Sequence, residues 1–216
     1  MNIRVLTSDD IPAVAAIHRA VFPHAAISRL GQGAAKKYYR LLISGLPGLV
    51  GLGAFEQNQL AAFCIVGSQQ VTEASFVRRH VPFIAWRVAT HPWLLVEPFI
   101  WSRIGSGLRL LLPHPPSSVA PAATRRNADA SYAIQHIAVH PGYQGRGLGR
   151  QLLIASENLA RERGCAEMHL SVYLDNAQAI GLYERMGWQK DFQDGAWRGF
   201  MFKRLGCPAG EVQSNR

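Results

Sequence analysis

A glycine-rich segment, Gln144-Gly145-Arg146-Gly147-Leu148-Gly149, carries the clearest chemistry in this sequence. Glycines at this spacing let successive backbone N–H groups point into one concavity, and a helix beginning beside them adds partial positive charge. Such a site suits a pyrophosphate, and Arg146 or Arg150 could add charge-assisted hydrogen bonds. A glycine-rich segment can also be a plain turn, but here a strand is expected before it and a helix after it. The segment therefore predicts a pyrophosphate-binding loop.

Two other phosphate-binding motifs fit this loop less well. A dinucleotide-binding fingerprint has two residues between its last glycines, whereas only Leu148 separates Gly147 from Gly149. A P-loop ends in Gly-Lys-Ser/Thr, which is missing from this segment. Neither motif accounts for the loop.

The expected elements around the loop alternate between strands and helices, as in an α/β domain. A helix face of Leu148, Leu152, Ala155 and Leu159 follows the loop, and Gly164 is expected to end that helix. In order, the expected elements are a strand at 3–6, a helix from about 9 to 21, a helix at 33–43, a hairpin of 49–55 and 60–66, a strand at 132–139, a helix at 148–163, a strand at 168–173, a helix at 176–186, and strands at 188–192 and 200–205.

The loop and a second segment together resemble the GNAT superfamily of acetyl-CoA-dependent N-acyltransferases. The family motif, Gln/Arg-x-x-Gly-x-Gly/Ala after a strand ending in Val, is met by 137–139 and 144–149. The second family block is met by 175–188, which reads Asp-Asn-Ala-Gln-Ala-Ile-Gly-Leu-Tyr-Glu-Arg-Met-Gly-Trp. The resemblance implies one α/β domain over 1–216. It has the GNAT fold, a mixed, mostly antiparallel central sheet flanked by helices, with a helical insertion between the third and fourth strands.

Carried over residue by residue, the resemblance implies which residues contact acetyl-CoA. The backbone of Ile137, Ala138 and Val139 would pair with the pantetheine arm, as an added strand does at a sheet edge. Asn176 would hydrogen-bond the same arm, and Tyr183 would protonate the leaving thiolate. The pyrophosphate would be held by Gln144, Gly145, Arg146, Gly147, Leu148, Gly149 and Arg150.

The general base is not evident from the sequence. Some family members place Glu or His at the strand positions that match Ala133 and Gln135, and neither residue here can take a proton. Two-residue alternation places His136 on the opposite strand face, which predicts a core or interface histidine. His169 or His24 could relay a proton through water, although a lone histidine is more often structural.

The resemblance implies direct acetyl transfer from acetyl-CoA to a primary amine in a ternary complex, without a metal. A small-molecule acceptor is expected, an anionic amino sugar being one candidate. Ser171 supports this expectation, because family members that acetylate protein N-termini often have Glu there. The alternatives are a protein or peptide amine acetyltransferase, a non-catalytic CoA-binding protein and a membrane-surface protein.

Charge and cysteine content limit the kinds of binding partner and the cellular compartment that the sequence suggests. The chain has 23 Lys and Arg against 14 Asp and Glu, a net charge of +9, which favours an anionic partner. No basic run or aromatic–basic sheet motif supports nucleic-acid binding, so none is expected. Peripheral membrane contact and a homodimer remain open. Three widely spaced cysteines predict neither a disulfide framework nor a zinc site, and no signal peptide is readable, which indicates a cytoplasmic protein.

Residues 68–130 are long for a connection that the family usually keeps short. They are rich in Trp and Arg, and helices are expected at 77–90 and 93–112. This insertion could form an extra helical layer, cover a pocket for a bulky anionic acceptor, or lie on an anionic membrane. Residues 22–31 are expected to form the other wall of the acceptor site.

Overall fold

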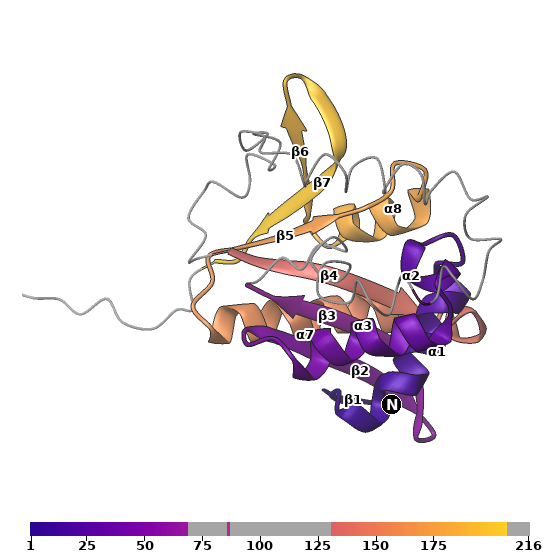
Figure 1. Cartoon of the computed structure of the whole chain (residues 1–216). Helices are drawn as coiled ribbons and strands as arrows, with labels where there is room; N and C mark the ends of the chain where they lie inside the picture. Colours follow the sequence, from indigo (N-terminus) through magenta and orange to yellow (C-terminus); the bar gives the residue numbers. More distant parts are fainter. Residues whose placement is uncertain (69–85, 87–130, 207–216) are drawn as a thin grey trace, which may run out of the picture.

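Seven strands form one sheet in the order β1-β2-β3-β4-β5-β7-β6 (Figure 1). The structure is a computed structural model that describes residues 1–68, Trp86 and 131–206. The strands are β1 (Asn2–Val5), β2 (Leu49–Glu56), β3 (Gln59–Gly67), β4 (Ser131–Val139), β5 (Glu167–Ser171), β6 (Gln189–Gln193) and β7 (Ala196–Arg204). The helices are α1 (Ile11–Val21), α2 (Ala26–Arg29), α3 (Gln32–Ser44), α7 (Leu148–Glu162) and α8 (Ala177–Arg185), with short 3-10 helices at Ser8–Asp10 and Pro141–Tyr143.

These bounds confirm the elements expected within the described part of the chain. The one helix there that the sequence did not predict is α2, which is a single turn. The prediction that Gly164 ends α7 is also confirmed. Gly164 has a φ of +72°, and its N–H donates to Arg161 O. The helices expected at 77–90 and 93–112 lie outside the described residues.

The sheet is mixed and mostly antiparallel, as expected. Its single parallel pair is β4 with β5, and every other neighbouring pair is antiparallel. Residues 68–130, the predicted insertion, lie between the third strand and the fourth in the sequence.

Helices cover the two faces of the sheet unequally. α7 packs on one face, where its buried positions Leu148, Leu152 and Leu153 meet residues such as Cys64 and Ile134. We call this cluster the α7-side core. The helices α1 and α3 pack on the opposite face over β2, β3 and β4, in a second cluster that includes Val14, Tyr38, Phe63 and Ile65. Apolar residues three and four apart on each helix produce these faces.

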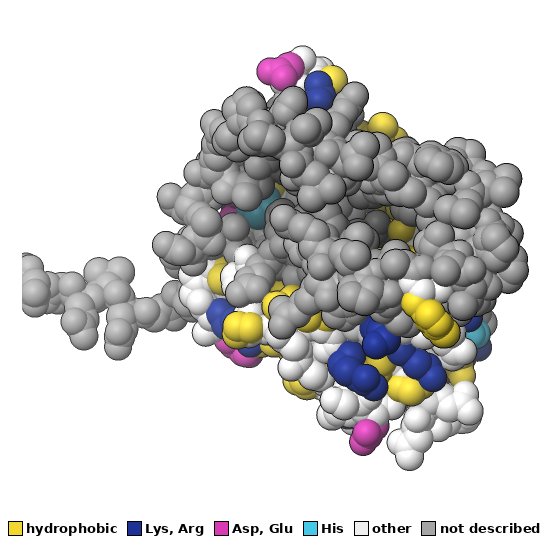
Figure 2. Space-filling view, viewed as in Figure 1, with side chains coloured by type: hydrophobic (Ala, Val, Ile, Leu, Met, Phe, Trp, Pro, Cys, Tyr) yellow, Lys and Arg dark blue, Asp and Glu magenta, His cyan; other side chains and the backbone are white. Residues whose placement is uncertain are grey.

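Basic side chains gather on the outer surface of the α1 and α3 layer (Figure 2). Along α3, the basic positions are Lys36, Lys37 and Arg40. Part of the positive charge of the chain is thus concentrated on this face. Within the described residues, no helix is long and apolar enough to cross a membrane.

A β-bulge at Gln135 interrupts the alternation of β4. Ile65 of β3 lies opposite His136, but the next residue, Val66, lies opposite Ile134, so Gln135 is the extra residue. The bulge therefore turns His136 toward α1 and α3, the face that Ala133 also takes. The prediction that His136 and Ala133 lie on opposite faces was wrong, because it assumed regular alternation.

Candidate active site

β4 and β5 lie side by side only over their first residues. Parallel pairing joins 131–134 of β4 to 167–170 of β5, and the strands then diverge (Figure 1). Past Ile134, β4 pairs with β3 alone among the residues that the structure describes. We call 135–139 the open edge of β4. An unpaired strand edge can bind an extended ligand through main-chain hydrogen bonds.

Two residues of the open edge direct their backbone groups away from β3. The His140 N–H donates to Ala61 O at 2.9 Å, so the backbone of His140 faces β3. In an antiparallel pair this direction alternates, which places the N–H and C=O groups of Ile137 and Val139 on the open side. Gln144 Nε2 accordingly reaches Val139 O, at 3.3 Å. Ala138, between them, turns its backbone to β3.

The predicted phosphate loop lies at the end of the open edge. Gly145 and Gly147 both have a φ of +78°, a conformation that glycine adopts without steric cost. Gly147 is the N-cap of α7, and the first intrahelical bond runs from Gln151 N to Gly147 O. The N–H groups of the first helical turn therefore have no acceptor within the helix. A Cβ at Gly145 or Gly147 would meet nothing within 4 Å, so the loop borders open space at these two glycines.

Packing fixes the loop against α8 and β4. Leu148 is buried in the α7-side core. A Cβ added at Gly149 would lie 3.4 Å from Leu182 Cδ2 and 3.7 Å from Val139 Cγ2, so a glycine there lets the helix start lie close to both elements. On the strand side, the Gly142 N–H donates to His140 Nδ1 at 3.1 Å.

The two loop arginines have different surroundings. Arg146 Nη1 lies 3.0 Å from Glu56 Oε2 at the end of β2, and its other terminal nitrogen donates to Gly142 O at 3.3 Å. Arg146 thus ties the loop to the β2–β3 hairpin. This ion pair is exposed, so it is weak enough for a phosphate to compete for the guanidinium. Arg150 is exposed on the first turn of α7.

Asn176 begins α8 as its N-cap. Its Oδ1 accepts the Ala179 N–H at 3.1 Å, so the side chain satisfies one of the free N–H groups at the helix start. The side-chain NH2 group does not take part in this cap, so its donors remain for a ligand.

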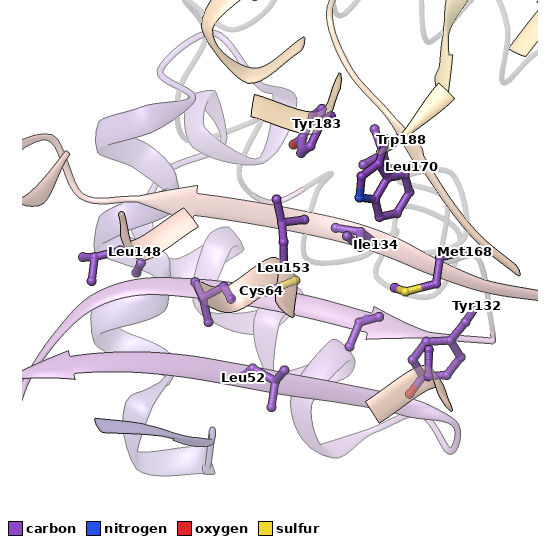
Figure 3. Close-up of a cluster of buried hydrophobic side chains, with 14 of the residues drawn as sticks. Leu52, Cys64, Tyr132, Ile134, Leu148, Leu153, Met168, Leu170, Tyr183 and Trp188 are labelled. Carbon is purple, nitrogen blue, oxygen red and sulfur yellow. The ribbon is translucent and has the colours of Figure 1, made fainter. Parts of the chain in front are cut away.

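Tyr183 lies on the face of α8 that is turned to the sheet. It is 5 % exposed and sits at the margin of the α7-side core beside Trp188 (Figure 3). Burial raises the pKa of Tyr183 above its ordinary value, and the Cys64 thiol adds to this shift. Among the described residues its hydroxyl has no hydrogen-bond partner. Tyr183 is therefore protonated at neutral pH and has a hydrogen bond to give.

A buried ion pair fixes the end of α8, and sequence reasoning missed it. Lys203 Nζ lies 2.7 Å from each carboxylate oxygen of Glu157 and donates to Met186 O at 2.6 Å. Trp188 Nε1 donates to Glu157 Oε1 at 3.2 Å. The signal in the sequence is Glu157 itself, a charged residue on the buried face of α7.

Two histidines form a cluster with two tyrosines between β4, α1 and α3. His136 Nε2 lies 2.8 Å from the Tyr38 hydroxyl, and His18 Nδ1 lies 2.7 Å from the Tyr39 hydroxyl. Burial lowers the pKa of His18 to about 4 and that of His136 to about 3, the latter with a contribution from His18. Such imidazoles stay neutral at physiological pH and hold a proton poorly. The contacts of His136 with Tyr38, Tyr39 and His18 agree with a structural histidine, although on the face opposite to the predicted one.

The remaining candidate histidines lie apart from this cluster. His24 is exposed in the turn between α1 and α2. His169 lies on β5, with its Nε2 3.0 Å from Glu167 Oε1. Within the described residues, no group of three or more His, Cys, Asp or Glu side chains is placed to hold a metal ion.

Known sequences are similar to the stretch of chain that holds this site. Residues 115–188 match the Acetyltransferase (GNAT) family. The chain is 37 % identical over 75 residues to a mycothiol acetyltransferase of Saccharopolyspora erythraea, covering 33 % of this chain and 25 % of that protein. It is 46 % identical over 54 residues to a streptothricin acetyltransferase of Streptomyces lavendulae, covering 25 % of this chain and 29 % of that protein. The matched stretches thus span about a quarter of the length of these curated relatives.

Solved structures share the fold over almost the whole chain. The ribosomal-protein-S18-alanine N-acetyltransferase of Escherichia coli superposes with a TM-score of 0.58 at 18 % identity, covering 99 % of both chains. YncA of Salmonella typhimurium, solved with its cofactor acetyl-CoA, superposes with a TM-score of 0.55 at 19 % identity, again covering 99 % of both chains. At these identities the likeness establishes the α/β GNAT fold.

Proposed function

We propose that this chain, a member of the GNAT acetyltransferase superfamily, transfers the acetyl group of acetyl-CoA to a primary amine. The observation that carries the proposal is the open edge of β4, which leads directly into a glycine loop at the start of α7. An extended arm that ends in a pyrophosphate fits both features at once. The family match supports acetyl-CoA as the donor.

In this proposal, backbone groups carry most of the binding of acetyl-CoA. The pantetheine arm pairs with Ile137 and Val139 along the open edge, and Asn176 donates its side-chain N–H groups to the same arm. The pyrophosphate takes the N–H groups of the loop and of the first turn of α7. Arg150, and Arg146 after it leaves Glu56, add charge-assisted contacts.

The chemical step requires a neutral amine and a stabilised leaving thiolate. The amine lone pair attacks the thioester carbonyl carbon, the N–C bond forms, and the C–S bond breaks with its electron pair going to sulfur. Backbone N–H groups of the open edge polarise the carbonyl. Tyr183 donates its hydroxyl proton to the sulfur, and the proton that nitrogen loses as the adduct collapses replaces it. The raised pKa of Tyr183 keeps this donor protonated at neutral pH.

We further propose that the acceptor is a small molecule. Two relatives that are similar in sequence bear the names of small-molecule acetyltransferases, one for mycothiol and one for streptothricin. Ser171, at the exposed end of β5, lacks the carboxylate that the family's peptide acetyltransferases often have there. The net charge of +9 favours an anionic acceptor such as an acidic amino sugar.

A panel of amines tests this proposal. The full-length protein is incubated with acetyl-CoA and each of a set of amino sugars, aminoglycosides, polyamines and short peptides with free N-termini. Thiol release from CoA is then measured against a blank without an amine. We expect turnover with one or more of the small amines. Turnover confined to peptides would contradict the acceptor class, and CoA binding without thiol release from any amine would contradict the reaction.

A further inference from the structure

β5 presents a row of polar side chains on the sheet face opposite α7. Met168 and Leu170 point into the α7-side core, so Glu167, His169 and Ser171 alternate onto the other face. We call these three residues the β5 polar row. They share their face with Ala133 of β4, which lies opposite His169.

Within the row, His169 and Glu167 form a close pair. His169 Nε2 is buried and lies 3.0 Å from Glu167 Oε1. The contact meets the distance but not the angle of a hydrogen bond, so this buried nitrogen lacks an aligned partner among the described residues. The His169 side chain is 16 % exposed and that of Glu167 is 28 % exposed.

The other elements beside His169 bring little competing charge. On β7, Phe202 lies opposite His169, and Arg204 lies opposite Glu167. Arg204 Nε is 3.8 Å from Glu167 Oε2, and this arginine is 83 % exposed, so solvent weakens its effect. On β4 the opposite residue, Ala133, does not titrate, and the nearest titratable residue on that face of the strand is the neutral His136.

The pair of His169 and Glu167 lies near the end of the open edge, where β4 starts to pair with β5. Val139 adjoins the phosphate loop, so an arm bound along the edge runs from Val139 past Ile137 toward the last paired residues, Ile134 and Leu170. In the proposed binding mode, its thioester end would lie at this junction of the two strands. His169 precedes Leu170 on the same strand, and its ring lies on the sheet face opposite α7.

We propose that His169, held by Glu167, takes the proton from the acceptor ammonium before acetyl transfer; this inference rests on the proposed function. The N–H bond of the ammonium breaks, its electron pair remains on nitrogen, and the proton moves to His169. The neutral amine then attacks the thioester as described above, and His169 returns its proton to water. Glu167 is a positioning residue that holds the ring through its contact with Nε2.

The cluster of His18 and His136 does not fill this role. Burial lowers the pKa of His18 to about 4 and that of His136 to about 3, far below the value of an alkylammonium. Their hydrogen bonds to Tyr39 and Tyr38 hold them within the α1 and α3 layer.

Kinetics on acceptors of different basicity test the role of His169. The best alkylamine of the panel is compared with an aromatic amine that is already neutral at the assay pH. His169→Gln should lower kcat/KM for the alkylamine by about 10²-fold and leave the acetyl-CoA KM nearly unchanged. For the aromatic amine, the loss should shrink to a few-fold, because no proton has to be removed before attack. Equal losses on both acceptors, or no loss on either, would overturn the role.

A measurement that does not depend on turnover tests the pair itself. The ring resonances of His169 are compared by NMR at one pH in the wild type and in Glu167→Gln, with exposed His24 as the internal control. Loss of the carboxylate 3.0 Å from Nε2 should shift the ring resonances of His169 and leave those of His24 unchanged. Unmoved His169 resonances overturn the pairing. A wild type that acetylates no amine overturns the proposed function instead, so the two failures are distinguishable.

Discussion

The cofactor side and the acceptor side of this molecule are built in different ways. On the cofactor side, the open edge of β4, the phosphate loop and the first turn of α7 follow one another within a single stretch of chain and offer mainly backbone groups. On the proposed acceptor side, side chains of α1, β4, β5 and β7 lie on one sheet face, and residues 68–130 lie between β3 and β4 in the sequence. Backbone recognition is therefore local in the sequence, whereas side-chain recognition depends on the tertiary fold.

The largest effect is expected at Tyr183, the side chain on which the chemistry of the cofactor side depends. Tyr183→Phe should lower kcat by roughly 10²- to 10⁴-fold, because the leaving sulfur loses its hydrogen-bond donor. The acetyl-CoA KM should change far less, since the arm is held by backbone groups. Steady-state kinetics over a range of pH would measure both constants. Turnover at the wild-type rate at every pH would reduce Tyr183 to a packing residue.

The next effect concerns the ion pair of Glu157 and Lys203, which fixes the end of α8. Here the cofactor side depends on residues that are distant in the sequence. Lys203→Met should destabilise the fold by up to about 3–5 kcal/mol, because the buried Glu157 carboxylate then keeps only Arg161, 3.5 Å away and partly exposed, as a charged partner. Urea unfolding would measure the loss. Lys190→Met is the matched control, because Lys190 pairs with Glu184 at 2.8 Å on the surface, and it should cost less than about 1 kcal/mol. Similar losses in both variants would show that the buried pair contributes no more to stability than the surface pair does.

CoA binding by the phosphate loop should be weakened mainly by an added negative charge and less by the strain of replacing a glycine. Gly147→Glu should weaken CoA binding by about 100-fold or more, roughly 2.7 kcal/mol, because a carboxylate would lie among the N–H groups that receive the pyrophosphate. Gly164→Glu is the control. Gly164 has a similar φ of +72° and equally open surroundings, but it lies at the far end of α7. Calorimetric titration should show near wild-type affinity in this control, and an equal loss in both variants would point to backbone strain alone.

The contrast between the two sides also explains what the sequence could predict. Glycine spacing, a helix stop at Gly164 and apolar periodicity are local signals, and they located the loop, α7 and most element bounds. The bulge at Gln135 was not predicted, because the alternation of side chains in the sequence does not reveal an extra residue. The sequence therefore placed His136 and Ala133 on opposite faces of the strand, whereas they share one face. The pair of Glu157 and Lys203 joins residues 46 positions apart, a proximity that only the fold reveals.

The smallest effect is expected in the insertion, on the acceptor side. Replacing Arg78, Arg79 and Arg87 together with Gln should raise the acceptor KM by about tenfold, roughly 1.4 kcal/mol, because an anionic acceptor loses cationic partners. The acetyl-CoA KM should stay nearly constant, since the cofactor motifs are complete without these residues. An equal rise in the acceptor KM and the acetyl-CoA KM would contradict the assignment of the insertion to the acceptor side alone. Vesicle co-sedimentation that disappears in this variant would assign the insertion to a membrane surface instead.

The central claim is that the open edge of β4 receives the arm of CoA as an added strand, and amide hydrogen exchange measures it residue by residue. Exchange is followed with and without saturating CoA. The amides of Ile137 and Val139 should exchange at least about tenfold more slowly in the complex, because each gains a hydrogen bond or loses contact with water. The amide of His140, already bonded to Ala61 O, serves as the control and should change little. Saturated CoA binding with unaltered exchange at both Ile137 and Val139 would contradict the account.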